Sequence, residues 1–197
     1  MGCGLVVLVS GTGTLLQSLI DAVHTGDLDA TILAVGADRS GTGGVDRANR
    51  AGLPTFEHPF ARGVDRSTWD RELTELVDAY RPDLVISAGF MKLVGPDFLA
   101  RFGGRMINTH PALLPAFPGM HGVRDALAYG VKVSGATVFL VDAGIDSGMI
   151  LAQDAVRVLD DDTVETLHER IKVVERQLLL DVVRDWSALS SHREAHQ

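Results

Sequence analysis

The sequence predicts an α/β fold with a Rossmann-like, mostly parallel sheet, helices on both faces, and antiparallel edge strands in the C-terminal half. Over the first hundred or so residues, short continuous apolar runs, which are typical of buried parallel strands, alternate with segments of helical periodicity. After residue 108, two longer strand-like segments follow each other across a glycine-rich loop. The length of 197 residues favours one domain, which we place at 1–184, followed by a polar tail at 185–197.

The individual elements follow from this patterning in chain order. Strands are expected at 4–9, 31–35, near Thr55, at 84–87, 106–108, 134–141 and 149–158. Helices are expected after the first glycine-rich turn, at 45–51, from a cap at Ser67 to Arg81-Pro82, at 124–129, and from Thr163 to about Val183. The segment 110–122, which holds three prolines and two glycines, reads as a long ordered loop.

Composition and charge argue against several classes of partner. The formal net charge is −8, from 26 acidic and 18 basic residues, and the basic residues are scattered, which disfavours nucleic-acid binding. No apolar run approaches the roughly 18 residues of a membrane span, and the first residues lack the basic region of a secretory signal. Cys3 is the only cysteine and the histidines lack ligand spacing, so we expect a cytoplasmic protein without a disulfide or a metal.

The first candidate site is the glycine-rich turn Ser10-Gly-Thr-Gly-Thr14, between the first strand and the first helix. Glycines let the backbone approach a ligand closely, and the first N–H groups of a helix attract a phosphate without bulk positive charge. Leu16 stands at the third glycine position of the dinucleotide fingerprint, so we expect phosphate rather than dinucleotide binding. An ordinary glycine turn is the alternative.

The second candidate site is Asn108-Thr-His-Pro111, at the end of a predicted strand. Asn108 and His110 lie two positions apart, so their side chains share one side of an extended segment. An amide donor beside an imidazole suits a developing oxyanion and proton transfer near neutral pH. Asp146, in the glycine-rich loop 142–148, could orient His110, although a role in stabilising the turn would also explain it.

Two further features concern small-molecule binding. The apolar segment from Ala88 to Val94 follows the fourth strand and could hold a flat heterocycle, or it could be a tightly packed loop. Asp38, at the end of the second strand, could be the ribose ligand of a nicotinamide-dependent oxidoreductase. That alternative leaves Asn108, His110 and Asp146 without a role.

Taken together, these segments resemble the folate-dependent formyltransferases from Leu5 to about Leu180. The motifs that carry the resemblance are Asn-Thr-His-Pro-Ala-Leu-Leu-Pro-Ala-Phe-Pro-Gly-Met-His at 108–121, Gly-Ala-Thr at 135–137, and Asp-x-Gly at 146–148. The Phe-Pro-Gly-x-His continuation is similar to the branch that acts on glycinamide ribonucleotide. The resemblance implies transfer of a formyl group from 10-formyltetrahydrofolate, without a metal, to the amine of 5-phosphoribosylglycinamide in purine synthesis.

The same resemblance implies residue roles. Asn108 would bond the formyl oxygen, His110 would polarise the formyl group and carry a proton, and Asp146 would position His110 and assist proton removal. The substrate phosphate is implied at Gly13, Thr14 and Leu15, and the glycinamide at Glu175. The folate site is implied at Arg66, Met91, Lys92, Leu93, Val94 and Asn108.

Three residues depart from the family pattern. Leu15 stands where the family often has Asn, so only backbone amides can serve the phosphate there; Lys92 replaces a frequent Arg; and Phe139 stands where a His is usual. The substitution at Phe139 leaves two alternatives open: a formyltransferase for a different amine, or a catalytically weak ligand-binding homologue. The substrates are expected to be small molecules, and whether the chain forms a homodimer is open.

Overall fold

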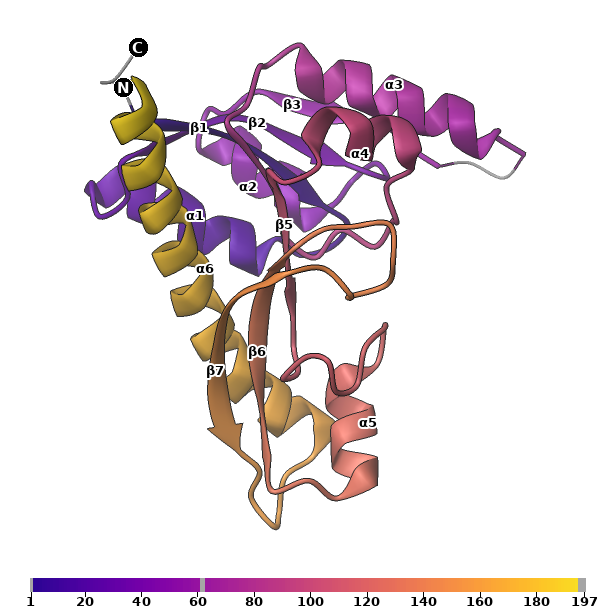
Figure 1. The fold of residues 1–197 in the computed structure, drawn as a ribbon, viewed down its shortest axis with the longest axis vertical. Coiled ribbons are helices and arrows are strands. Elements are labelled where there is room, and N and C mark those ends of the chain that lie inside the picture. Colours follow the sequence, from indigo (N-terminus) through magenta and orange to yellow (C-terminus); the bar gives the residue numbers. More distant parts are fainter. Residues whose placement is uncertain (1, 61–62, 195–197) are drawn as a thin grey trace.

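In the computed structural model, which describes residues 2–60 and 63–194, the strands form a seven-stranded sheet of order β3-β2-β1-β4-β5-β6-β7 (Figure 1). The strands are β1 (Cys3–Val9), β2 (Ala30–Ala37), β3 (Thr55–Glu57), β4 (Leu84–Ser87), β5 (Met106–His110), β6 (Val133–Leu140) and β7 (Ile150–Arg157). The first five are parallel, and β6 and β7 join as antiparallel edge strands. The predicted fold class is therefore confirmed.

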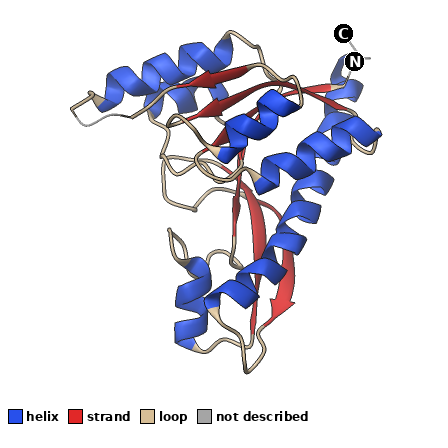
Figure 2. Cartoon of the chain, turned by 180° about the vertical axis from the view of Figure 1, so that it is seen from behind, coloured by secondary structure: helices blue, strands red, loops and turns tan. Residues whose placement is uncertain are grey.

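Helices cover both faces of this sheet (Figure 2). They are α1 (Thr14–Thr25), α2 (Gly43–Arg50), α3 (Arg66–Asp78), α4 (Pro96–Phe102), α5 (Gly122–Tyr129) and α6 (Val164–Glu194). α1, α2 and the C-terminal part of α6 pack on one face of the parallel strands, and α3 and α4 pack on the other. Both faces are thereby closed to water, which accounts for the continuous apolar runs of the parallel strands.

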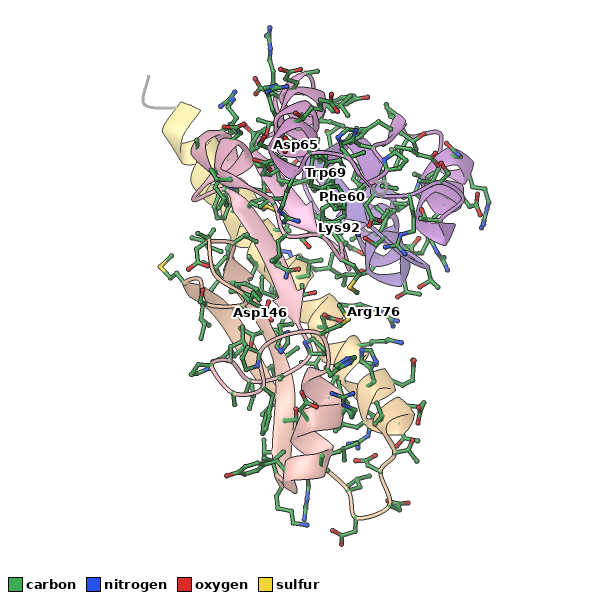
Figure 3. All side chains as sticks on the ribbon, turned by 90° about the vertical axis from the view of Figure 1, so that its right-hand side faces the viewer. Phe60, Asp65, Trp69, Lys92, Asp146 and Arg176 are labelled. Atoms are coloured by element: carbon green, nitrogen blue, oxygen red, sulfur yellow. The ribbon has the colours of Figure 1, made fainter. Side chains whose placement is uncertain are left out.

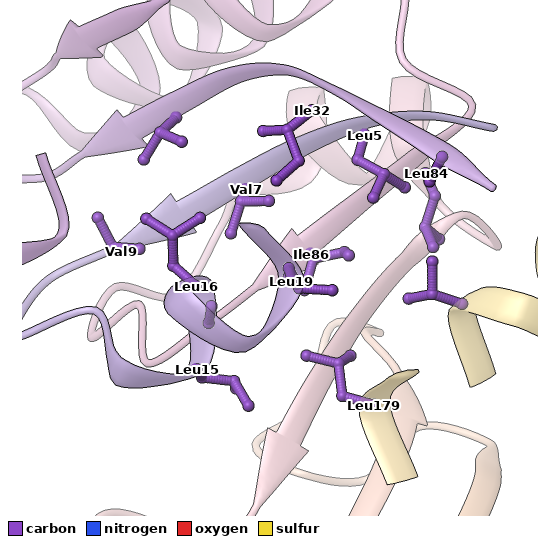
Figure 4. Packing of buried hydrophobic residues seen from close by; sticks show 14 of the residues in the cluster. Leu5, Val7, Val9, Leu15, Leu16, Leu19, Ile32, Leu84, Ile86 and Leu179 are labelled. Carbon is purple, nitrogen blue, oxygen red and sulfur yellow. The ribbon is translucent and has the colours of Figure 1, made fainter. Parts of the chain in front are cut away.

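The central strand β1 illustrates how the sequence forms this core. All seven of its residues are buried, and their side chains alternate between the two faces. Leu5, Val7 and Val9 pack against α1 and α6 (Figure 4), whereas Val6 and Leu8 face α3 and α4. Burial of each such side chain contributes about 1.5–3 kcal/mol. The carboxyl end of β1 is thus held rigidly, and it leads directly into the turn that begins at Ser10.

The structure corrects two expected boundaries. The residue that caps α3 is Asp65, whose carboxylate accepts a hydrogen bond from the backbone N–H of Thr68 (2.8 Å), and not Ser67, which lies inside the helix. The segment 185–197, expected as a polar tail, is helical as far as Glu194, because Trp186 extends the apolar stripe of α6 onto the core. Residues 195–197 lie outside the described part of the chain. α4 was not anticipated from the sequence.

The C-terminal half extends away from the parallel strands. β6, β7, α5 and the first turns of α6 enclose a smaller core of Val123, Ala136, Val156, Leu167 and Ile171. The loop between β6 and β7 returns toward the parallel strands (Figure 1), so that it lies beside the carboxyl end of β5. This junction between the two halves is where the candidate site lies. No helix in the described ranges is long and apolar enough to span a membrane.

Candidate active site

The structure brings His110 and Asp146 together at the carboxyl end of β5. The Nδ1 atom of His110 lies 3.4 Å from Oδ2 of Asp146, and both side chains are largely buried, with 5% and 13% of their surface exposed. The same Asp146 oxygen accepts a hydrogen bond of 2.7 Å from the backbone N–H of Gly119. The antiparallel pairing of β5 with β6 is what closes the 36-residue separation, which sequence spacing could not resolve.

The second ring nitrogen of His110 also has a partner. Nε2 lies 2.7 Å from the carbonyl oxygen of Phe117. Because a carbonyl oxygen can only accept a hydrogen bond, Nε2 carries the hydrogen in this contact. Nδ1 is then the nitrogen that can exchange a proton with Asp146. The ring is thereby fixed in orientation from both sides.

Both partners of His110 have an uncommon backbone conformation. Phe117 has a φ of 53° and Asp146 a φ of 51°, and Arg81 is the only other non-glycine residue with a positive φ in the described ranges. Such a conformation costs about 1–3 kcal/mol and persists where the surrounding contacts enforce it. Its coincidence with the two residues that hold His110 supports a site whose geometry matters for function.

The 110–122 loop is anchored by two polar side chains of the edge strands. The Thr137 hydroxyl donates to the carbonyl of Ala112 (2.7 Å) and accepts from the N–H of Leu114 (3.1 Å). The Gln153 side-chain amide donates to the Leu114 carbonyl (2.8 Å) and to the Thr137 hydroxyl (2.9 Å). Sequence reasoning assigned no role to either residue, although Thr137 ends the quoted Gly-Ala-Thr motif.

Asn108 and Phe139 are direct neighbours across β5 and β6. Asn108 is half-buried, and Phe139 is buried and has no side-chain atom that can form a conventional hydrogen bond. Within the described ranges, the polar contacts of the Asp146 carboxylate are those with the His110 ring and with the backbone N–H of Gly119. An imidazole at position 139 would place a polar group beside Asn108 that this chain lacks.

Glu175 approaches the same centre from α6. Burial raises the pKa of this carboxyl group, and a hydrogen bond with Thr109 and the positive charges of Arg176 and Lys172 offset part of the rise. Thr109 is the residue between Asn108 and His110, so the predicted glycinamide contact lies directly against the strand that carries them.

The predicted phosphate site lies at the start of α1. Gly13 caps the helix with a φ of 70° and supplies no side-chain acceptor, so Thr14 and Leu15 begin a helix without a side-chain cap. A Cβ atom on Gly13 would lie 2.5 Å from Cα of Gly44, so the turn packs against α2 too closely for any other residue. The Leu15 side chain is buried in the core, which leaves backbone groups as its contribution to a ligand.

The predicted folate loop is tied to the phosphate turn. The Ser10 hydroxyl accepts a hydrogen bond of 2.8 Å from the backbone N–H of Met91. Arg66 donates to the Leu93 carbonyl (2.6 Å), and the side chains of Met91 and Leu93 are exposed. The cations of Arg66 and Lys92 lie over the Phe60 ring, at 5.9 and 5.4 Å from its centroid. Figure 3 shows Lys92 beside Phe60.

Asp38 is engaged within the protein. Its carboxylate is fully buried, forms two hydrogen bonds with the Arg39 guanidinium (3.1 and 2.9 Å), and lies 3.9 Å from Nζ of Lys92. Burial alone would raise its pKa, but hydrogen bonds from Arg39 and Ser10 and the two cationic charges lower it overall. This residue therefore secures the 91–94 loop and does not present an open carboxylate to a ribose. In the described ranges, no group of three or more His, Cys, Asp or Glu side chains is placed to hold a metal ion.

Comparison with known proteins identifies the family of this chain. The formyl transferase family model matches residues 4–183, and the chain belongs to this family. It is 58% identical over 188 residues to the phosphoribosylglycinamide formyltransferase of Mycobacterium tuberculosis, with 95% of this chain and 85% of that protein covered. It is 36% identical to the corresponding protein of Escherichia coli, covering 97% and 91%. Glycinamide ribonucleotide transformylase 1 from Symbiobacterium toebii superimposes with a TM-score of 0.90 at 42% identity, covering 93% of this chain and 86% of that one.

Proposed function

We propose that this chain is a folate-dependent formyltransferase that transfers a formyl group from 10-formyltetrahydrofolate to the amine of 5-phosphoribosylglycinamide in purine synthesis. The observation that carries the proposal is the contact between His110 and Asp146 at the end of β5, two residues after Asn108. This set supplies a hydrogen-bond donor, a proton carrier and a carboxylate at one place. Membership of the formyl transferase family and the similarity to phosphoribosylglycinamide formyltransferases support it.

The reaction follows from these groups. The acceptor amine attacks the formyl carbon, and the electron pair of the C=O bond moves to oxygen. The Asn108 amide stabilises that oxyanion, while the amine proton passes to the Asp146–His110 pair. The bond between the formyl carbon and N10 of the folate then breaks, and N10 takes a proton. Nothing is oxidised or reduced, and the products are the formylated amine and tetrahydrofolate.

The geometry of His110 sets a condition on its role. Each ring nitrogen has a partner in this structure, Phe117 at Nε2 and Asp146 at Nδ1. Contact between an imidazole N–H and the formyl oxygen therefore requires the ring to exchange one partner for substrate. Release of the Phe117 carbonyl keeps the link to Asp146 and is the simpler exchange.

The substrate subsites surround this centre. We place the acceptor phosphate on the backbone at Gly13, Thr14 and Leu15, and the glycinamide at Glu175. The folate donor is placed at Asn108 and along the 89–94 loop, with contacts from Arg66, Met91, Lys92, Leu93 and Val94. The Ser10–Met91 hydrogen bond joins the loops that carry the two subsites, which favours a fixed distance between donor and acceptor.

The proposal also covers the extent of the domain, the cellular location and the oligomeric state of the protein. A formyltransferase domain at 1–184 is supported by the family match, which ends at residue 183. A cytoplasmic location is supported by cysteine usage, since Cys3 is the only cysteine of the sequence. Analytical ultracentrifugation would test whether the protein forms a homodimer, which the sequence leaves open.

Turnover with the two substrates is the direct test. The protein is mixed with 10-formyltetrahydrofolate and 5-phosphoribosylglycinamide, and loss of the formyl donor is followed. We expect turnover by the native chain and none by His110→Ala. The matched control is His24→Ala, because His24 is exposed in the last turn of α1 and is not among the residues proposed for the site. Absence of turnover in the native chain, or full activity of His110→Ala, would refute the assignment.

Phe139 favours one second candidate, a formyltransferase for a different amine. The buried phenyl ring beside Asn108 replaces the polar group expected there and changes the wall of the site. A panel of amines, including an amino sugar, would be assayed with the native chain and with Phe139→His. Preference for another amine by the native chain, reversed in the variant, would establish this candidate in place of the first.

A further inference from the structure

A hollow of about 260 Å³ opens beside the predicted phosphate turn. It is lined by Thr14, Gln17, Ser18, Asp21, Arg47 and Arg176. Four of these residues come from α1, one from α2 and one from α6, so three helices that are separate in sequence converge on it. Two guanidinium groups therefore face one small space next to Thr14, in a chain whose net charge is −8.

Arg47 is held in place by neutral acceptors. It donates to the carbonyl of Thr12 (2.8 Å) and to the side-chain oxygen of Gln17 (2.9 Å). These contacts fix the guanidinium at the turn, and no carboxylate in the described ranges forms an ion pair with it. Arg47 thus makes the turn electropositive and also supports its backbone.

Arg176 differs from Arg47 because its guanidinium has no hydrogen-bonding partner among the described residues. It is half-buried on α6, and it forms no hydrogen bond or ion pair with any residue in the described ranges. Its charge acts on the neighbouring Glu175, whose pKa it lowers. Figure 3 shows Arg176 at the same level along the long axis as Asp146. Five donors of a guanidinium are therefore available at the hollow.

We propose that Arg176 binds the phosphate of the acceptor substrate and supplies the side-chain contact that Leu15 cannot provide. The proposal rests on the function proposed above. A guanidinium bonds two phosphate oxygens at once, and this complements the backbone N–H groups at Thr14. Adjacent residues on a helix diverge by about 100°, so Glu175 and Arg176 can contact opposite ends of one substrate.

Asp21 provides a second variant with an effect of opposite sign. Its carboxylate lines the same hollow and accepts a hydrogen bond of 2.8 Å from the Gln17 amide. A phosphate bound there would be repelled by this charge. Asn keeps the acceptor oxygen and removes the charge, so Asp21→Asn should tighten phosphate binding by a few fold.

The experiment measures phosphate binding apart from turnover. Calorimetry with ribose 5-phosphate, in the absence of folate, is carried out on the native chain and on Arg176→Ala, Arg176→Lys and Asp21→Asn. We expect Arg176→Ala to weaken binding by about 10- to 100-fold, the range of a charge-assisted hydrogen bond, and Arg176→Lys to recover part of the loss. The matched control is Arg184→Ala, because Arg184 lies two turns further along α6 and pairs with Asp181.

Steady-state kinetics then separates the two proposals. Arg176→Ala should raise KM for the phosphorylated acceptor by the same factor and leave KM for the formyl donor unchanged. Equal binding of ribose 5-phosphate by Arg176→Ala and the native chain, or no binding by either, would overturn the role of Arg176 even if formyl transfer is intact. Binding that depends on Arg176 in a chain without formyl transfer would uphold the phosphate site and refute the proposed reaction.

Discussion

Gly122→Ala offers a sharp test of how His110 is held. Gly122 is the first residue of α5, and a Cβ atom there would lie 2.8 Å from Nε2 of His110 and 3.0 Å from the carbonyl oxygen of Phe117. The methyl group would enter between the two partners of one hydrogen bond. Ordinary contact begins at 3.4 Å, so relief of the closest approach requires a displacement of about 0.6 Å, the difference between 3.4 and 2.8 Å.

The size of the effect follows from three terms. Overpacking costs about 1–3 kcal/mol, and loss of the bond between His110 and Phe117 costs about 1 kcal/mol. Replacement of glycine by alanine within a helix returns about 1 kcal/mol. The net expectation is a loss of about 1–3 kcal/mol in the free energy of unfolding. Turnover should fall by about tenfold or more, since 1 Å of misplacement can cost 100-fold.

A double-mutant cycle isolates the cause. Urea unfolding and formyl-donor turnover are measured for the native chain, Gly122→Ala, His110→Ala and the double variant. If the methyl group acts through the imidazole, its cost to stability shrinks once His110 is alanine. Unchanged stability and turnover in the single variant would refute the argument, as would an equal stability cost in both backgrounds.

Three further changes probe the surroundings of the site. Thr137→Val removes a buried hydroxyl that forms three hydrogen bonds, so the 110–122 loop loses its anchor. The free energy of unfolding, measured in urea, should fall by about 2–3 kcal/mol, and turnover should fall as well. Turnover equal to that of the native chain would contradict this role. The pKa of Glu175 is raised, mainly by burial, so the native chain loses stability as pH rises through that pKa. A reaction rate that requires the Glu175 carboxylate is instead lost as pH falls through the same pKa. Glu175→Gln should remove both dependences, and a pH–rate profile with the same acidic limb would exclude Glu175 as its source. The pKa of Asp38 is lowered, so its contribution to the stability of the fold is present at neutral pH and is lost as pH falls. Asp38→Asn should therefore lower the free energy of unfolding by about 1–2 kcal/mol at pH 7 and by almost nothing in acid. A stability loss that does not change with pH would count against this carboxylate.

A strand or helix could be predicted from the sequence where its segment shows one clear pattern of hydrophobic residues. The apolar runs of β1 and β4 lie between two layers of helices, so burial dictates their composition. α4 was missed because its seven residues give little periodicity. The end of α6 was placed too early because Trp186 packs on the core among polar neighbours, and a lone aromatic residue gives no repeating pattern.

The candidate site was predictable only in part. Asn108, His110 and Asp146 belong to recognisable motifs, and the antiparallel register of β5 and β6 brings the last two into contact. The partners contributed by Phe117 and Gly119 were not predictable, because each uses a backbone atom that every residue type possesses. Such contacts depend on the path of the 110–122 loop, which only the three-dimensional structure shows.

The acidic character of the chain is compatible with two anionic substrates because of how its cations are paired. Arg39 and Lys92 share the Asp38 carboxylate, which offsets one of their two positive charges and secures the 91–94 loop. Arg47 and Arg66 are held by uncharged oxygens, which fix the guanidinium groups without cancelling them. A fixed cation with a neutral partner keeps its attraction for an anion and loses little entropy on binding. We therefore expect recognition of the anions to depend on the partners of a few cations at the proposed site and not on net charge.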